Sequence, residues 1–422
     1  MQYTRHIFDN GLTLLVHEDH DTPLATVNLL YGVGARDEDP SRTGFAHLFE
    51  HLMFGGTRLV PDFDAVVNAL GGESNAFTNN DYTNYYITVP GEHLAEALRL
   101  EADRMGGLDL TQHALEVQQR VVVEEYHQRY LNQPYGDVWL LLRPLCYRVH
   151  PYRWCTIGAD IDHVRQATLD DVRAFFDRYY CPNNAVLAVA GAARADEVVR
   201  LVDQCFGSIP MGRQCLDRHY PTEPEPTEAR RLCCHRDVPT EAFYRAYPIC
   251  DHYHPDFYAY DLLSDLLGNG KSSRLYRRLV VEQPLLSEVD ACVSGEVGDG
   301  LLLLTGKLRD GVAYEQVASL LDEVLQELAS QPVGDYELQK VVNKYESNFV
   351  YAQYKAADRA QSLCYYEWLG DVGLVNSEPE HYRRVTPAQI ADVAARCFQP
   401  HRACTLNYCP IPNTAADDGR TA

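Results

Sequence analysis

The chain has 422 residues, and at ~150 residues per domain this length predicts two or three domains. Hydrophobic residues make up 46% and charged residues 23%, which excludes disorder of the whole chain. The formal net charge of −23 repels phosphate backbones and anionic lipids, and no apolar stretch approaches the ~20 residues of a membrane span. We therefore expect no nucleic acid and no membrane among the partners.

The beginning and the cysteines of the chain indicate its compartment. The first residues lack a basic segment followed by an apolar run, so we expect no signal peptide and a cytoplasmic location. The 13 cysteines are scattered, with no C-x-x-C spacing, which argues against a zinc finger or a thioredoxin-type motif. We expect most of them to be reduced, buried side chains.

The first half of the chain mixes strands with helices. Asn10-Gly11 between two apolar runs is a hairpin signal. Periodicity and composition then predict strands over 25–31, 81–89 and 185–190, and helices over 44–53, 63–70, 93–105, 115–132 and 170–178. Strands come first, helices follow and strands return, which is an α+β pattern and not a strict βαβ alternation.

The second half repeats this order after a proline-rich stretch within 211–231, which reads as an exposed linker. It predicts strands over 242–247, 288–293, 301–304 and 405–409, and helices over 256–267, 315–329 and 335–366. We predict two similar α/β-sandwich halves related by internal duplication, in an α+β fold. The expected domains are 1–215 and 231–412, joined by a linker over 216–230 and followed by a disordered tail over 413–422.

One motif carries the chemistry. His47 and His51 are four residues apart on a predicted helix, so both imidazoles project from one face, as two ligands of a tetrahedral Zn²⁺ require. Glu50 lies beside them, where its carboxylate can reach a metal-bound water. Chance on an amphipathic helix is the alternative, and a third ligand decides between the two. Glu124 and Glu125 are candidates, and only one of them can face the metal because neighbouring helical residues point about 100° apart.

These residues resemble those of the M16 (pitrilysin-like) zinc metallopeptidases, the inverted-motif family that includes mitochondrial processing peptidase. The resemblance covers essentially the whole chain, and the length matches the short, single-unit members. It rests on the motif at 47–51 and on six further segments: Leu52-Met53-Phe54-Gly55-Gly56-Thr57, Gly71 to Thr78, Asp81-Tyr82-Thr83, Leu100 to Met105, Val121 to Glu125, and Ser272-Ser273-Arg274-Leu275-Tyr276.

The resemblance implies a role for each matching residue. His47, His51 and Glu125 become the ligands of one Zn²⁺ per chain, and Glu50 becomes the general base that activates the zinc-bound water. Asn75, Ala76, Phe77 and Thr78 match the strand edge that holds an extended peptide substrate. The family often has a glutamate seven residues before its zinc-binding glutamate. Gln118 stands there in this chain, as an outer residue that can still hydrogen-bond a ligand.

One departure from the family concerns the second half. Members with a complete active site carry an arginine and a tyrosine, seven residues apart, that stabilise the developing charge on the substrate carbonyl. Alignment by eye places Val280 and Ser287 at those positions. Loss of one such donor typically costs ~10²–10³ in rate. We therefore expect a second chain, in a homodimer or in a heterodimer with an M16-like chain that carries the Arg/Tyr pair.

The sequence thus predicts a zinc-dependent endopeptidase or oligopeptidase that cleaves extended peptides. Two alternatives remain: a non-catalytic assembly subunit that keeps the fold, and a peptide-binding module that holds zinc and turns over poorly. The missing Arg/Tyr pair favours the alternatives, and the complete set of His47, Glu50, His51 and Glu125 favours the peptidase.

Overall fold

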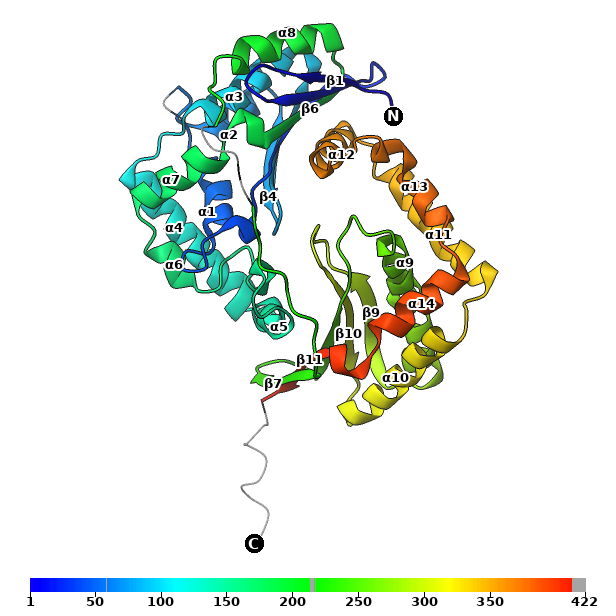
Figure 1. The fold of residues 1–422 in the computed structure, drawn as a ribbon. Coiled ribbons are helices and arrows are strands. Elements are labelled where there is room, and N and C mark those ends of the chain that lie inside the picture. Colours follow the sequence, from blue (N-terminus) through cyan, green and yellow to red (C-terminus); the bar gives the residue numbers. More distant parts are fainter. Residues whose placement is uncertain (58, 213–215, 217, 412–422) are drawn as a thin grey trace. The chain divides into compact units, whose positions relative to one another are not determined.

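The computed structural model describes residues 1–57, 59–212, 216 and 218–411. The predicted tail over 413–422 lies outside the described residues. The chain forms two compact units, each built on one sheet with helices packed against it (Figure 1). Unit 1 comprises 1–126, 150–221 and 345–380, and unit 2 comprises 127–149, 222–344 and 381–422. Neither unit is continuous in the sequence, because each includes a segment from the other half of the chain.

The sheet of unit 1 has six strands. In spatial order they are β1 (Thr4–Ile7), β2 (Thr13–Glu18), β6 (Ala185–Gly191), β3 (Leu24–Tyr31), β5 (Thr83–Pro90) and β4 (Glu73–Thr78). The hairpin predicted around Asn10-Gly11 is β1 and β2, which pair in antiparallel register. The central strands β6 and β3 are buried along almost their whole length, and α12 packs on both while α3 also packs on β3.

The helices of unit 1 are α1 (Phe45–Leu52), α2 (Phe63–Ala69), α3 (Leu94–Gly106), α4 (Gln112–Tyr126), α6 (Ile161–Arg165), α7 (Leu169–Tyr179), α8 (Ala195–Phe206) and α12 (Ala356–Leu369). Helices α3 and α8 pack on strands β3, β5 and β2, and α12 packs on β3 and β6. Contacts of α12 include the buried Cys364 thiol, which donates to the carbonyl oxygens of Asn28 and Val186. A helix of the second half of the sequence thus completes the core of the first sheet.

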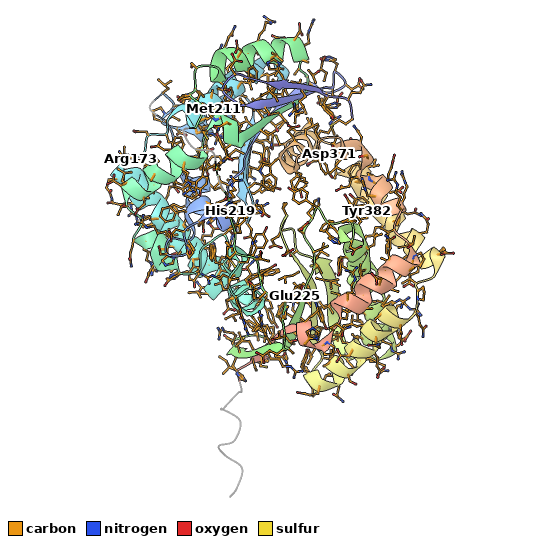
Figure 2. The ribbon with its side chains drawn as sticks, viewed as in Figure 1. Arg173, Met211, His219, Glu225, Asp371 and Tyr382 are labelled. Atoms are coloured by element: carbon orange, nitrogen blue, oxygen red, sulfur yellow. The ribbon has the colours of Figure 1, made fainter. Side chains whose placement is uncertain are left out.

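Unit 2 has a five-stranded sheet. Its spatial order is β7 (Arg230–Arg236), β11 (Cys404–Pro410), β8 (Ala242–Pro248), β10 (Leu301–Leu308) and β9 (Leu286–Val293). Helices α9 (Phe257–Gly268), α10 (Tyr314–Ser330) and α14 (Pro387–Cys397) pack as a group, with α9 against β9 and β10, and α5 (Val138–Cys146) packs on β11, β7 and β8. Figure 2 labels Tyr382 of this unit. The Tyr382 hydroxyl donates to Asp261 Oδ2 at 2.7 Å.

The two sheets share one topology. In unit 1, β2 runs parallel to β6, and β6–β3, β3–β5 and β5–β4 are antiparallel. In unit 2, β7 runs parallel to β11, and β11–β8, β8–β10 and β10–β9 are antiparallel. Each strand of the second sheet therefore has a counterpart in the first. The predicted α+β fold with two similar halves is confirmed.

The predicted helix over 335–366 is wrong as a single element. The structure has α11 (Asp335–Tyr351) and α12, separated by a turn over 352–355, and α13 (Leu374–Arg383) follows. The break frees α12 to pack across β3 and β6, where its buried face contributes to the core of unit 1. No glycine or proline marks this turn, so the sequence alone did not reveal it.

Candidate zinc and peptide site

The site begins with the way α1 is held. Its first turn follows Gly44, whose φ of 89° is a left-handed conformation that favours glycine. The side-chain oxygens of buried Glu38 accept hydrogen bonds from the backbone N–H groups of Gly44 at 2.9 Å and Ala46 at 2.8 Å. Burial raises the pKa of Glu38 to about 8. This carboxyl satisfies helix-terminal N–H groups and fixes the start of the helix that carries both histidines.

His47 and His51 project from the same face of α1. Their ring centroids lie 4.9 Å apart and the ring planes are nearly perpendicular, at 88°. His47 is buried and His51 is half-buried. The predicted helical spacing therefore places two imidazoles together on one face of α1, one of them buried and the other half-buried.

Helix α4 brings the third group. Glu125 Oε2 lies 3.2 Å from His51 Nε2 and 3.6 Å from His47 Nε2. The preceding Glu124 is exposed and stands outside this cluster. Gln119 fixes α4 by donating from Nε2 to backbone carbonyl oxygens at the end of α6 and just after it, at 2.8 to 3.2 Å. Of the two glutamates left open by the motif, the structure brings Glu125 to the histidines.

The three donor atoms fit a tetrahedral metal ion. Zinc binds imidazole nitrogen and carboxylate oxygen at roughly 2.0–2.2 Å, and a tetrahedron of such bonds separates its corners by roughly 3.3 Å. The separations of 3.2 and 3.6 Å between Glu125 and the two histidines bracket this value. Two imidazoles with one carboxylate also form the donor set of a catalytic zinc site with one position left for water. The residues present therefore fit Zn²⁺.

Glu50 lies between the histidines in the sequence and contacts a strand in space. Thr78 Oγ1 donates to Glu50 Oε2 at 2.6 Å, a short distance typical of a hydrogen bond to a charged oxygen. Thr78 is the last residue of β4, so this bond ties the side chain of the predicted base to the edge of the sheet. The structure thus brings together two residues that the sequence placed in separate roles.

Strand β4 is the terminal strand of its sheet in the described part of the chain, and it pairs with β5 alone. Asn75 is exposed, and Ala76, Phe77 and Thr78 are half-buried. The Asn75 side chain accepts from the N–H of Ala76 at 2.8 Å. The predicted peptide-holding residues therefore lie on a sheet edge that ends beside Glu50.

The remaining predicted residues lie on three elements. Gln118 is half-buried on α4, two helical turns before Glu125 and on the same helical face. In unit 2, Val280 is half-buried in a π-helical segment (Tyr276–Glu282), and Ser287 is exposed at the start of β9, where its hydroxyl donates to the carbonyl oxygen of Lys307 at 3.3 Å.

The sequence did not predict the buried pair of charged residues on α3. Arg104 and Glu101 of α3 are both fully buried and form an ion pair at 2.5 Å. The Arg104 guanidinium also stacks on three aromatic rings, with its carbon 4.2 Å from the centroid of Phe63 and within 5.4 Å of Phe54 and Tyr85. Both charged residues lie in the segment Leu100 to Met105, which stood out only by its resemblance to family members. The capping role of Glu38 had no signal in the sequence.

Two family models match the chain. The model described as insulinase (peptidase family M16) matches residues 13–136, and the model described as the peptidase M16 inactive domain matches residues 166–345. The chain belongs to peptidase family M16. The family resemblance seen in the sequence is therefore confirmed. Within the described residues, no helix combines the length and the apolar character that a membrane span requires.

Two relatives carry the name zinc protease. The zinc protease PqqE of Helicobacter pylori is 29% identical over 402 residues, which cover 94% of this chain and 90% of that protein. The uncharacterized zinc protease YmxG of Bacillus subtilis is 26% identical over 339 residues, covering 77% of this chain and 78% of the relative.

Two solved structures share the fold of this chain. The crystal structure of a protease from Helicobacter pylori superposes with a TM-score of 0.91 at 28% identity, covering 97% of this chain and 99% of that one. A structure from Pseudomonas fluorescens, described as a peptidase M16 inactive domain, has the same fold, with a TM-score of 0.86 at 16% identity and coverage of 98% of each chain.

Proposed function

We propose that this chain is a zinc-dependent endopeptidase or oligopeptidase that hydrolyses extended peptides and binds one catalytic zinc ion. The observation that carries the proposal is the convergence of His47, His51 and Glu125, whose donor atoms all lie within 4.8 Å of one another, beside the carboxylate of Glu50. A bound zinc ion would polarise the substrate carbonyl and make water nucleophilic near neutral pH.

The residues of the chain would handle the proton. Glu50 accepts a proton from the attacking water and passes it to the leaving amine, as a general base and then a general acid. Thr78 orients Glu50 through the 2.6 Å hydrogen bond to Oε2. His47, His51 and Glu125 would hold the metal, and Gln118, as an outer residue, would hydrogen-bond one of these ligands.

The peptide would bind as an additional strand on β4. An extended segment that pairs with a sheet edge gains backbone hydrogen bonds with modest sequence preference. Asn75, Ala76, Phe77 and Thr78 would form this edge, and the strand would run past the Thr78–Glu50 hydrogen bond toward the metal ligands. The proposed substrate is accordingly an unfolded or short peptide segment, because a folded domain presents few free strands.

A second chain would supply what Val280 and Ser287 lack. Neither side chain carries a cation or a phenol that could stabilise a developing oxyanion. We propose a homodimer, or a heterodimer with an M16-like chain that carries the Arg/Tyr pair. The cytoplasmic location expected from the sequence stays a prediction, and cell fractionation tests it.

The second candidate function is a non-catalytic or peptide-binding subunit of an M16-type complex. The description of the matching second-half model as an inactive domain favours it, together with the residues at 280 and 287. The intact metal cluster favours the peptidase, because a purely structural chain needs none of these ligands.

Hydrolysis of a mixed library of quenched fluorescent peptides separates a self-sufficient peptidase from a chain that needs a partner or does not catalyse. The zinc-loaded chain is compared with Glu50→Gln, which keeps the size of the side chain and removes the base. Cleavage by the wild type that the variant loses supports a self-sufficient peptidase. Bound zinc without cleavage by either protein contradicts it and directs the search to a partner chain.

A further inference from the structure

A second group of metal-binding side chains lies on the sheet of unit 2, at the edge strand β7 and its neighbour β11. Seven of the twelve described cysteines are buried, as expected for most of them, but Cys233 is exposed. Cys233 and His235 are alternate residues of β7 and therefore project from the same face of the sheet. Cys409 stands directly opposite His235 in the parallel pairing of β7 with β11.

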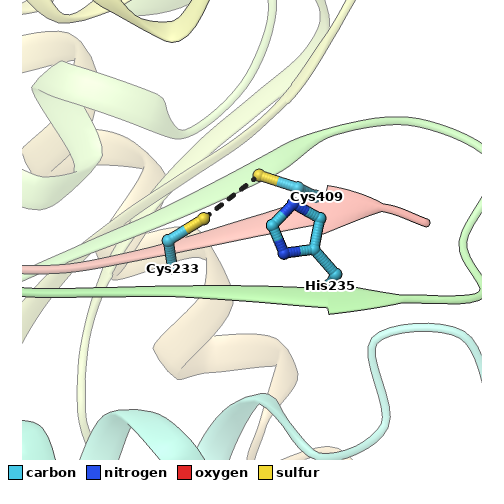
Figure 3. Close-up of side chains that lie close together, drawn as sticks. All are labelled: Cys233, His235 and Cys409. Carbon is cyan, nitrogen blue, oxygen red and sulfur yellow. Dashed lines mark hydrogen bonds between the residues drawn. The ribbon is translucent and has the colours of Figure 1, made fainter. Parts of the chain in front are cut away.

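The three side chains converge (Figure 3). The sulfur atoms of Cys233 and Cys409 lie 3.5 Å apart, and one donor atom from each of the three residues lies within 4.8 Å of the others. Two thiolates bound to one zinc ion at about 2.3 Å each are separated by roughly 3.8 Å in a tetrahedron. The observed sulfur separation is within a few tenths of an ångström of that value, so a metal ion could enter with little movement of either strand.

We propose that Cys233, His235 and Cys409 bind a second zinc ion. Two thiolates and one imidazole are soft and intermediate donors, which favour Zn²⁺ over the hard ions Mg²⁺ and Ca²⁺. The three side chains supply three of the four ligands of a tetrahedral zinc ion, and a water would take the fourth position. Binding replaces the two thiol protons by two metal–sulfur bonds and releases both protons, with no change in oxidation state.

The pairing of β7 with β11 holds the two thiols and the imidazole at a spacing that suits a shared metal ion. Strand β7 is the outermost strand of its sheet, and its ladder with β11 fixes the spacing of all three residues. A zinc ion held from both strands would tie the edge strand to the sheet. This site is separate from that of His47, His51 and Glu125, which contains no sulfur, so a signal from thiolate ligands reports on the second site alone.

Titration of the reduced, metal-free full-length chain with Co²⁺ tests the proposal, because cobalt substitutes for zinc and thiolate ligands add a charge-transfer absorption in the ultraviolet. We expect this absorption in the wild type and in Glu125→Gln, which removes a ligand of the other site. We also expect it in Cys292→Ser, which removes an exposed cysteine of β9 as a matched control. Cys233→Ser/Cys409→Ser should lose it, and His235→Ala should shift or weaken it.

Zinc content gives the second readout. After zinc loading we expect two ions per chain in the wild type and one in either Cys233→Ser/Cys409→Ser or Glu125→Gln. A wild type without thiolate absorption, or an absorption that survives the double substitution, overturns the proposal. Recovery of Cys233 and Cys409 as a disulfide that persists under reducing conditions also overturns it. Neither result bears on peptide cleavage, which is measured separately with Glu50→Gln.

Discussion

Replacing Thr78 by valine removes one hydroxyl from the strand beside Glu50 and leaves the size and branching of the side chain almost unchanged. The lost bond is a 2.6 Å hydrogen bond to a carboxylate oxygen, in a half-buried position. Hydrogen bonds to charged groups are worth about 1.5–3 kcal/mol. Because 1.36 kcal/mol corresponds to a factor of ten in rate, the expected loss is roughly 13- to 160-fold in kcat/KM.

The effect should appear in kcat, because Thr78→Val disturbs the orientation of Glu50 more than it disturbs strand pairing. Steady-state hydrolysis of a quenched peptide, in the preparation that shows Glu50-dependent cleavage, separates kcat from KM. Thr78→Ser keeps the hydroxyl and should stay close to the wild type. Zinc content should be equal in all three proteins. Wild-type kcat/KM in Thr78→Val, or a loss confined to KM, would refute the role of this hydrogen bond.

Three further predictions follow from the site and its supports. Glu125→Gln should weaken zinc binding by more than the roughly 10–100-fold that loss of an outer hydrogen-bond partner costs, whereas Glu124→Gln should keep it, as measured by metal content after dialysis. The pKa of Glu38 is raised from 4.5 to about 8 in the folded chain. As pH rises, the unfolded chain therefore loses this proton at a lower pH than the folded chain does. The stability of the wild type relative to Glu38→Gln should therefore fall between about pH 5 and 7.5, by at most about 1.4 kcal/mol per pH unit in urea denaturation, and a flat difference would contradict it. Arg104→Met should lower the free energy of unfolding by about 3–5 kcal/mol, because it leaves the Glu101 carboxylate buried without its cation, and Arg104→Met/Glu101→Leu should recover most of the loss.

Local signals in the sequence predicted most of the elements that carry the site. The four-residue spacing of His47 and His51 on a helix implies their shared face, and a β-branched, aromatic run marks β5. The selection of Glu125 over Glu124 needed the family resemblance, because helical geometry alone says only that one of the two can face the metal.

Features that depend on contacts between distant segments were not predictable. The hydrogen bond from Thr78 to Glu50 joins residues on different elements, and no local pattern encodes it. Glu38 and the pair of Arg104 with Glu101 are charged residues, which are normally placed at the surface, and only the fold reveals that they are buried. The cluster of Cys233, His235 and Cys409 joins two strands more than 170 residues apart in the chain, so its spacing in the sequence resembles no metal-binding motif.

Helix α12 packs on the first sheet, and this packing limits where the chain can be divided into two fragments. A gene fragment that ends within the linker would encode β3 and β6 without the helix that buries one of their faces, and α5 would be missing from the complementary fragment. Each product would expose a broad apolar surface and would favour aggregation. A protease cut in the same linker, made after folding, leaves every core contact in place. The two halves of the sequence can therefore be cut apart after folding and stay associated through α5 and α12, whereas either half made alone lacks part of its core.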